Sequence, residues 1–266
     1  MFEAKFDIKG SALIKKSLEV ASGILHEVCI IVQKEKGITI TAMDLSHICL
    51  VHLQFSPKDC LVFEGPEEEF EFAVNLIDLG KILRRLSAGE LFEMKIPLEE
   101  KQLSLQMRKE GQKKVRSFKL GLMDVDKEEI NLAGLLETAV TYPNSFSLDV
   151  DLLIEAIGDA EIYAEALRLT VSDKLKFSAD GNIGDMEYEI EFDELSEAKI
   201  TEKTDGIFAI SFLKNILKAS TITKDMSLKL VDQGPLFITF NITGDSHMIF
   251  FLAPRVEDDD FMDDEN

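Results

Sequence analysis

Two similar stretches of sequence, FAVNLIDLGKIL starting at Phe72 and FAISFLKNIL starting at Phe208, indicate that this chain is built from two related halves. Each stretch begins as a β-rich run and continues with apolar residues three or four positions apart, which is the spacing of one helix face. The two stretches start about half a chain apart, and similarity at such a distance is typical of a duplicated domain.

The order of predicted elements repeats in the same way. In the first half, apolar spacing predicts helices within Ser11–Leu25 and Val74–Ala88, and alternating β-rich runs fill most of the remainder. In the second half, helical stripes are expected over Val150–Ile157 and Leu213–Leu217, each followed by further strand-like runs. The segment from Met123, MDVDKEEINLAGLLET, has no clean period and is predicted to be a linker between the halves.

The composition limits the possible classes of protein. The chain has 266 residues, which is enough for one or two domains with a real hydrophobic core. Its 50 acidic and 29 basic residues give a formal net charge of −21. This charge excludes a compact basic protein that coats nucleic acid with its whole surface, but it is compatible with a local basic patch. The last ten residues, from Glu257, are predicted to be a solvated acidic tail.

The cysteines, Cys29, Cys49 and Cys60, lack CxxC spacing. We expect reduced, mostly buried thiols in an intracellular protein. No apolar run reaches the length of a membrane span, and the first residues do not have the pattern of a signal peptide. The sequence therefore predicts an intracellular, cytoplasmic protein without membrane association.

Motifs of common enzymes are missing from the sequence. There is no glycine-rich phosphate loop and no nucleophile elbow, and His47 and His52 would face opposite sides of a strand, which makes a poor metal pair. The acidic clusters Glu67–Glu69 and Asp258–Asp260 are better explained as a solvated loop and tail than as metal ligands. We therefore expect no catalytic residue, no metal and no cofactor, and keep an acidic metal-dependent hydrolase only as a remote alternative.

Basic residues are few, but they gather on the outer faces of three predicted helices. Each face alone is an ordinary solvated surface, yet three such faces are less ordinary in a chain of net charge −21. Together they indicate a surface that accepts a phosphate backbone through diffuse, non-specific contacts. The residues concerned are Lys15, Lys16, Lys81, Arg84, Arg85, Lys214 and Lys218.

Two strand-like segments carry opposite charges. The segment KKVRSFK, from Lys113, is basic, and the segment EYEIEFDE, from Glu187, alternates acidic with apolar residues. Opposite charges that face each other stabilise a sheet, so the two segments could pair across subunits. If both are edge strands at opposite ends of the chain, the contact is head to tail and produces a ring or a filament. The pattern alone leaves open the alternative of two solvated strand faces.

Several spaced motifs resemble one known family. The segment ITAMDLSHICLVHLQF, from Ile40, closely resembles the segment that marks the DNA polymerase sliding clamp of archaea and eukaryotes, the proliferating cell nuclear antigen (PCNA) family. The closing FFLAPRVE, from Phe250, resembles that family's C-terminal motif. GSALIKKSLE from Gly10, FKLGLMDVD from Phe118 and AIGDA from Ala156 also fit. The resemblance covers nearly the whole chain in order and is closer to the archaeal type.

The resemblance implies an α+β DNA-clamp fold, with two similar domains that each have antiparallel sheets outside and two helices inside. Three chains would join head to tail into a ring of pseudo-sixfold symmetry. The implied division is an N-terminal clamp domain over 1–121, an interdomain connecting loop over 122–137, a C-terminal clamp domain over 138–256 and the acidic tail over 257–266.

The implied function is that of a non-enzymatic processivity factor. The ring would encircle duplex DNA without sequence preference and tether DNA polymerase and other replication and repair enzymes. The implied partners are DNA polymerase, a clamp loader, a flap endonuclease and a ligase, which bind through short peptide motifs with a glutamine and an aromatic pair. A mostly acidic exterior would discourage DNA from binding outside the ring.

The resemblance also implies three sets of site residues. The basic residues named above would face DNA. The partner-peptide groove, an exposed apolar pocket beside a flexible loop that suits aromatic anchors, would use Met43, His47, Ile48, Leu50, Ile130, Leu132, Pro235, Phe251, Ala253 and Pro254. The subunit interface would use Lys113, Lys114, Arg116, Phe118, Glu187, Glu189, Ile190 and Glu191.

The chain departs from the family pattern in two places. Asp149 and Leu152 stand where arginines are common, so the third predicted helix is acidic and an uneven basic lining is expected. This departure keeps open an alternative in which the chain works only in a heterotrimer with paralogues. Asn131 and Ala133 stand where glycine and proline are usual, so the conformation of the connecting loop is expected to differ.

Overall fold

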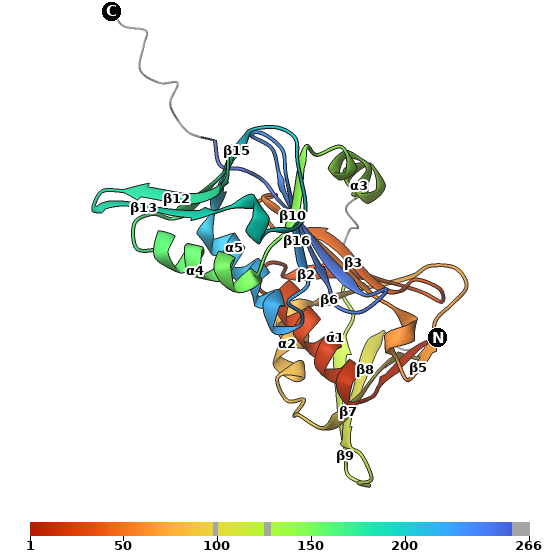
Figure 1. Ribbon diagram of the computed structural model, residues 1–266. Helices are drawn as coiled ribbons and strands as arrows, with labels where there is room; N and C mark the ends of the chain where they lie inside the picture. The colour runs from red at the N-terminus through yellow and green to blue at the C-terminus, as the bar shows by residue number, and fades with distance from the viewer. Residues whose placement is uncertain (98–100, 125–128, 257–266) are drawn as a thin grey trace, which may run out of the picture.

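The computed structural model describes residues 1–97, 101–124 and 129–256, and shows an α+β chain in which every named strand pair is antiparallel. Figure 1 follows the chain from its N-terminus to its C-terminus. The predicted acidic tail and part of the predicted linker lie outside the described residues.

The first half contains the elements up to β9. They are β1 (Phe2–Phe6), α1 (Ile8–Ala21), β2 (Glu27–Gln33), β3 (Gly37–Met43), β4 (Cys49–Phe55), the short 3-10 helix η1 (Pro57–Asp59), β5 (Val62–Glu64), β6 (Phe70–Asn75), α2 (Leu76–Leu83), β7 (Glu90–Ile96), β8 (Gln102–Lys109) and β9 (Val115–Gly121).

The second half follows a connecting helix, α3 (Leu132–Val140). Its elements are β10 (Asn144–Ser147), α4 (Val150–Ala160), β11 (Ala166–Val171), β12 (Leu175–Gly181), β13 (Gly184–Ile190), η2 (Phe192–Glu194), β14 (Ser196–Ile200), β15 (Thr204–Ala209), α5 (Ile210–Ile216), η3 (Leu217–Thr221), β16 (Met226–Leu230), β17 (Leu236–Asn241) and β18 (His247–Leu252).

The strands form three sheets that reveal the duplication. A five-stranded sheet has the order β5-β1-β7-β8-β9, and a four-stranded sheet has the order β13-β12-β11-β15. The third, nine-stranded sheet joins β14-β10-β16-β17-β18 to β4-β3-β2-β6 through the pairing of β18 with β4. Each half therefore contributes one five-stranded and one four-stranded set of strands, so the predicted duplication is present in the fold.

The register makes the halves correspond residue by residue. Ala4 lies opposite Met94 on β1 and β7, as Phe146 lies opposite Leu228 on β10 and β16. In this correspondence β9 matches β18 and β13 matches β4, and the short helices η1 and η2 also match. The pairing of β18 with β4, hereafter the seam, is thus formed by the counterparts of β9 and β13.

The correspondence corrects the repeat predicted from the sequence. Asn75 and Ala209 are the N-cap residues of α2 and α5, so Val74 rather than Phe72 matches Phe208. Val74 and Phe208 are both fully buried. The prediction was wrong by two residues because it matched two identical Phe-Ala pairs, whereas the helix starts set the true alignment.

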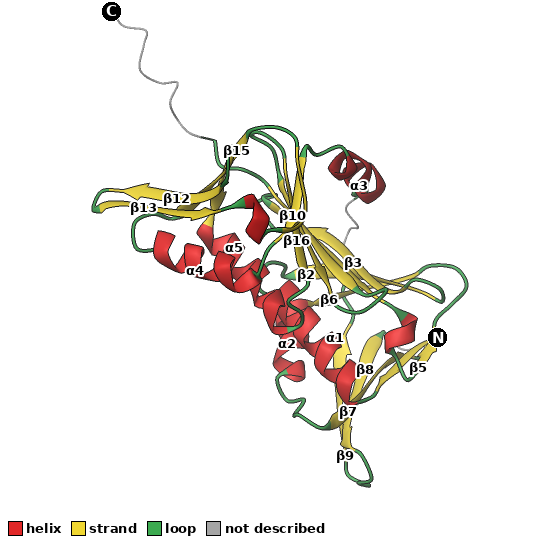
Figure 2. Ribbon diagram, in the orientation of Figure 1, coloured by secondary structure: helices red, strands yellow, loops and turns green. Residues whose placement is uncertain are grey.

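Four helices lie on one side of the sheets. Figure 2 shows α1, α2, α4 and α5 in one row, while α3 lies apart beyond β10 and β16. Alternate strand residues, such as Phe2, Ala4 and Phe6 of β1, are buried. The main core contains residues of both halves, so burial of apolar surface stabilises the two halves together.

Helix caps explain where the predicted helix bounds were wrong. The first helix was expected within Ser11–Leu25 but spans Ile8–Ala21, because the Asp7 carboxylate accepts a hydrogen bond of 2.7 Å from the Gly10 amide and starts the helix early. The second helix, expected over Val74–Ala88, is confined to Leu76–Leu83.

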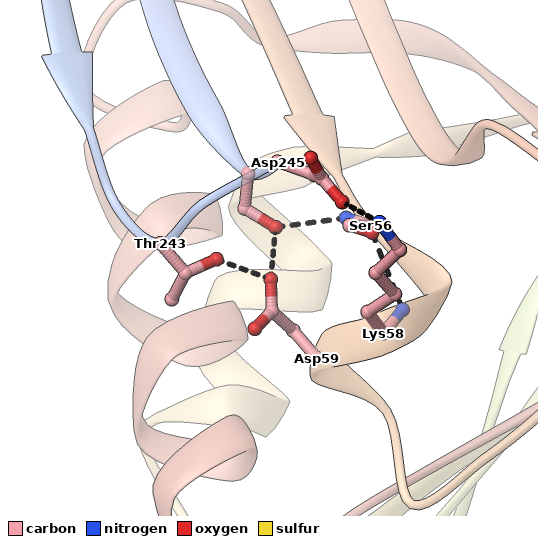
Figure 3. Close-up of polar contacts among 6 residues, drawn as sticks. Ser56, Lys58, Asp59, Thr243 and Asp245 are labelled. Atoms are coloured by element: carbon pink, nitrogen blue, oxygen red, sulfur yellow. Dashed lines mark hydrogen bonds and ion pairs between the residues drawn. The ribbon is translucent and has the colours of Figure 1, made fainter.

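A hydrogen-bond network fastens the two halves at the end of β4 (Figure 3). The Ser246 hydroxyl accepts from the Ser56 amide at 2.8 Å and donates to Asp59 Oδ2 at 2.5 Å. The Thr243 hydroxyl donates to the same Asp59 oxygen. Lys58 Nζ forms an exposed ion pair with Asp245. The turn between β17 and β18 is therefore held against η1.

His52 lies on the outer face of the same seam. Its Nδ1 is 2.8 Å from the Thr41 hydroxyl, and its ring centroid is 5.6 Å from that of His247 on β18. Burial lowers the pKa of His52 to about 4, and the neighbouring His247 adds to the shift. The fold thus brings together two histidines that are scattered in the sequence.

We predict that Asp59→Ala lowers the free energy of unfolding by about 1–3 kcal/mol, because it leaves two partly buried hydroxyl donors without their acceptor. Urea unfolding measures this effect. The control Asp245→Ala removes only the exposed Lys58 ion pair, which water screens, and should change the stability much less than Asp59→Ala does. Equal destabilisation in the two variants would contradict the role of Asp59.

We also predict a pH dependence from His52. Its pKa is below the ordinary value of 6.5, so the folded chain resists a proton that the unfolded chain accepts. Stability should be complete above pH 6.5 and fall as pH decreases towards 4, by up to about 3 kcal/mol from this group. Urea unfolding at a series of pH values should show a smaller decrease in His52→Gln, and an equal decrease would exclude His52 as the cause.

Candidate nucleic-acid and protein interfaces

The structure brings the predicted DNA-facing residues together in the helix layer. Lys15 and Lys16 lie on α1, Lys81 lies on α2 with Arg84 and Arg85 directly after it, and Lys214 and Lys218 lie on α5 and η3. The side chains of α1 are anchored to neighbouring backbone: Lys15 Nζ donates to the Leu86 carbonyl at 2.8 Å, and Lys16 Nζ donates to the Thr221 carbonyl at 2.5 Å. The α1 ammonium groups therefore also tie the helices of the layer to one another.

Ion pairs neutralise part of the positive charge in both halves of this layer: in the first half, Lys81 pairs with Asp78 at 2.7 Å and Lys15 lies 4.0 Å from Glu19. In the second half, Lys214 Nζ donates to both carboxylate oxygens of Glu161 at 2.7 Å, and Lys224 is paired with Asp151 of α4. Arg84 and Arg85 are exposed, and no ion pair involves them within the described part of the chain. Helix α4 and its N-cap residue add further exposed carboxylates: Asp149 at the cap, and Glu155 and Asp159 in the helix. The second half of the layer therefore offers less net positive charge to a phosphate backbone than the first half.

The two oppositely charged segments are edge strands. β9 pairs only with β8, and β13 pairs only with β12, among the described residues. In Figure 1 they lie at opposite ends of the molecule. This placement meets the condition for head-to-tail association that the sequence left open.

Ion pairs inside the chain reduce the charge contrast between these edges. Lys174 and Lys176 of the β12 hairpin pair with Glu189 and Glu187 at 2.8 and 2.9 Å, and these carboxylates raise the pKa of both lysines. Lys174 also lies 3.5 Å from Glu191. Sequence reasoning missed these pairs, although the alternating KLKF run carries the lysines at strand spacing.

The remaining interface residues occupy different positions. Arg116 is paired with Glu90 at 2.5 Å and also donates to the Arg85 carbonyl, so it already has partners in its own chain. Ile190 is buried in the main core. Phe118, on the other edge strand, is half-buried and packs against the same core. Lys113 and Lys114 are exposed in the turn before β9.

The predicted partner groove corresponds to a row of apolar residues across the outer face of the nine-stranded sheet. Met43 lies opposite Leu50, Leu50 opposite Phe251, and Phe251 opposite Phe237. The Phe237 and Phe251 rings meet edge to face with centroids 4.7 Å apart. The row crosses the seam, so both halves of the chain build it.

Helix α3 covers this row. Its Leu132, Leu135, Leu136 and Ala139 pack against the cluster that contains Leu50, Phe237, Ile249 and Phe251. Leu50 and Phe251 are consequently only 3% and 7% exposed. The exposed pocket beside a flexible loop that was expected from the sequence is therefore filled by the chain itself, and the predicted linker contains a helix.

The other predicted groove residues surround the covered row. Ile48, Ala253 and Pro254 line a separate hollow of about 930 Å³ with Ala209 and Ile210. His47 and Pro235 are exposed, and Ile130 packs against the α3 cluster.

The loop before β4 is held by Asp44. Its carboxylate accepts from the amides of Ser46, Ile48 and Cys49 at 2.7–2.8 Å. His47, with a φ of 54°, adopts the left-handed conformation that this tight loop requires. Ile48 is thereby directed to the rim of the hollow, where its carbonyl accepts from the Ala253 amide at 2.8 Å.

Metal clusters and membrane-spanning helices are both missing from the described residues. No three histidine, cysteine or acidic side chains among them lie close enough to hold a metal ion. No helix in the same part of the chain has the length and hydropathy of a membrane span. The three cysteines form no disulfide with one another.

Family models match most of the chain. Residues 1–129 match the N-terminal domain of proliferating cell nuclear antigen, and residues 159–255 match its C-terminal domain. Curated relatives include the DNA polymerase sliding clamps of Methanococcus vannielii, 28% identical over 91% of this chain and 95% of the relative, and of Methanobrevibacter smithii, 29% identical over 98% and 100%. The proliferating cell nuclear antigen of Chaetomium thermophilum is 25% identical over 98% of this chain and 100% of its own. On these grounds the chain belongs to the proliferating cell nuclear antigen family.

Proposed function

We propose that this chain is the protomer of a sliding clamp, a non-enzymatic ring that encircles duplex DNA and holds DNA polymerase and other replication enzymes on it. Family membership supports this function. Ring assembly is supported by the position of two strands. β9 and β13 are the counterparts of the seam strands β18 and β4, and they lie at opposite ends of the molecule as edge strands.

The seam inside the chain serves as the template for the seam between chains. The β18–β4 pairing connects the second half to the first by six residue pairs. If β9 of one copy pairs with β13 of the next in the same way, each contact adds a copy head to tail and can close into a ring. Three chains then place six similar domains around one axis, with the helix layer towards DNA.

The internal correspondence also supports one register for the pairing between chains. Phe118 of β9 matches Phe250 of β18, and Met186 of β13 matches Val51 of β4. Phe250 lies opposite Val51, so Phe118 should lie opposite Met186 of the next copy. The neighbouring positions follow in the same register: Arg116 opposite Tyr188, Lys119 opposite Asp185, and Leu120 opposite Gly184.

The template also predicts an ion pair between copies. Inside the chain, Lys58 of η1 pairs with Asp245 of the β17–β18 turn. Their counterparts are Asp193 of η2 and Lys113 of the β8–β9 turn, which carry the opposite signs. An ion pair between Asp193 of one copy and Lys113 of the next would therefore form at the equivalent place, with the positions of the two charges exchanged.

The finer partner assignments extend this proposal. The loader, polymerase, flap endonuclease and ligase would bind through short peptides at the row that contains Leu50 and Phe251. The clamp would act inside the cell with chromosomal DNA. Residues 1–121 and 138–256 are proposed as the two clamp domains that each chain contributes to the ring, joined by the connecting segment.

We predict that Lys113→Glu and Asp193→Lys each weaken the trimer, and that the double variant restores it. Each single change places like charges across the proposed contact, whereas the double change exchanges them. Light scattering over a range of concentration and salt measures the mass, and the contact should loosen as salt rises.

Lys36→Glu is the matched control, because Lys36 is exposed in the turn between β2 and β3, away from both edges. Single variants that keep the wild-type mass under every condition would refute the ion pair. A wild-type chain that is never larger than a dimer would instead favour a ring with paralogues.

We also predict that DNA binding depends on the first-half helices. Arg84→Ala/Arg85→Ala should weaken the binding of short duplexes and reduce the salt slope by roughly 0.9 for each phosphate that is no longer neutralised. Lys214→Ala/Glu161→Ala removes a neutral pair and should have little effect. Fluorescence anisotropy at several salt concentrations compares the two double variants, and an equal decrease in affinity would contradict the uneven lining.

A further inference from the structure

We propose that α3 is a built-in competitor of partner peptides: it occupies the apolar row at the seam and must leave before a peptide's aromatic anchors can enter. This inference rests on the proposed partner groove. It concerns only the row of Met43, Leu50, Phe251 and Phe237, with Ile249 beside it, hereafter the seam row.

The packing of α3 on the seam row is that of a bound amphipathic helix. Ala139 is only 1% exposed, and Leu132, Leu135 and Leu136 contact the same cluster. Glu137 and Thr138 on the other face of α3 are exposed. One helix face therefore fills the apolar surface on which a peptide's anchors would pack.

Both ends of α3 are tied down. The Asn131 side chain accepts from the Gly134 amide at 3.0 Å and caps the start of the helix. At the other end, Lys229 Nζ donates to the Ala139 carbonyl at 3.3 Å and lies 5.2 Å from the centre of the Phe237 ring. Lys229 therefore connects α3 directly to the seam row.

This arrangement belongs to the part of the chain that the family models leave unmatched. The matches end at residue 129 and resume at 159, and α3 lies between them. Asn131, which caps the helix, lies in the same unmatched part of the chain. In Figure 2 the helix lies on the far side of the seam from the other four helices.

A nine-residue helix has little stability by itself, so packing on the seam row is what holds α3 in place. The chain then has a closed state with α3 on the row and an open state with the row exposed. A peptide that binds only the open state has its apparent affinity reduced by the fraction of chains that are open. Partner affinity therefore depends on how firmly α3 is held.

The test uses the full-length clamp and a fluorescein-labelled peptide that contains a glutamine and two adjacent phenylalanines. Lys229→Met keeps an apolar stem beside Phe237 but removes the donor to α3. We expect this variant to bind the peptide about threefold to tenfold more tightly than wild type. Lys199→Met is the matched control. Lys199 lies in the same cross-strand row as Lys229 but two strands beyond it, further from Phe237, so this variant should leave peptide affinity unchanged.

A second variant releases α3 more completely. Leu136→Asp places a charge on the packed face, whereas Thr138→Asp makes a similar change on the exposed face. The first should tighten peptide binding and the second should not. Unchanged or weaker binding in both Lys229→Met and Leu136→Asp would overturn the competition.

Hydrogen exchange separates the possible failures. Saturating wild type with the peptide should speed the exchange of the α3 amides over residues 132–140, because the helix is displaced. Slower exchange would mean that α3 is a wall of the groove and would overturn the proposal. If no variant binds the peptide although α3 is protected from exchange, the assignment of the seam row as partner groove fails, and the competition fails with it.

Discussion

The antiparallel pairing of β18 with β4 is the interaction on which the rest of this structure depends. It joins two duplicated halves into one nine-stranded sheet and places Phe251 beside Leu50. Without it neither the shared core nor the seam row would exist. Because the counterparts of these two strands are left as edges, one pairing geometry can serve twice, inside the chain and between copies.

The few exposed basic residues of the helix layer suit a protein that surrounds DNA and binds it only weakly. The chain has a net charge of −21, yet Arg84 and Arg85 remain exposed on the helix layer, while Lys214 is neutralised by Glu161. A topological link does not require a continuous basic lining, since the ring itself keeps DNA in place. Weak, diffuse phosphate contacts leave such a ring able to slide.

The connecting segment has a larger role than spacing the halves. Its helix α3 packs on residues contributed by both sides of the seam, including Leu50 and Phe237. The region that would recruit partners and the segment that covers it are therefore parts of one apolar cluster. In such an arrangement, recruitment depends on the local stability of a short helix as well as on contacts with the partner.

The sequence by itself determined the repeated order of helices and strands, the charged faces and the family resemblance, because periodicity and motifs are local properties. Only the tertiary structure decided that Val74 matches Phe208, that Lys174 neutralises Glu189, and that α3 covers the seam row. These depend on which strands lie side by side. Helix α3 does have apolar residues at helical spacing, but nine residues are too few for a stable helix until Phe237 and Phe251 provide a surface for them. Long-range pairing, not local propensity, set these features.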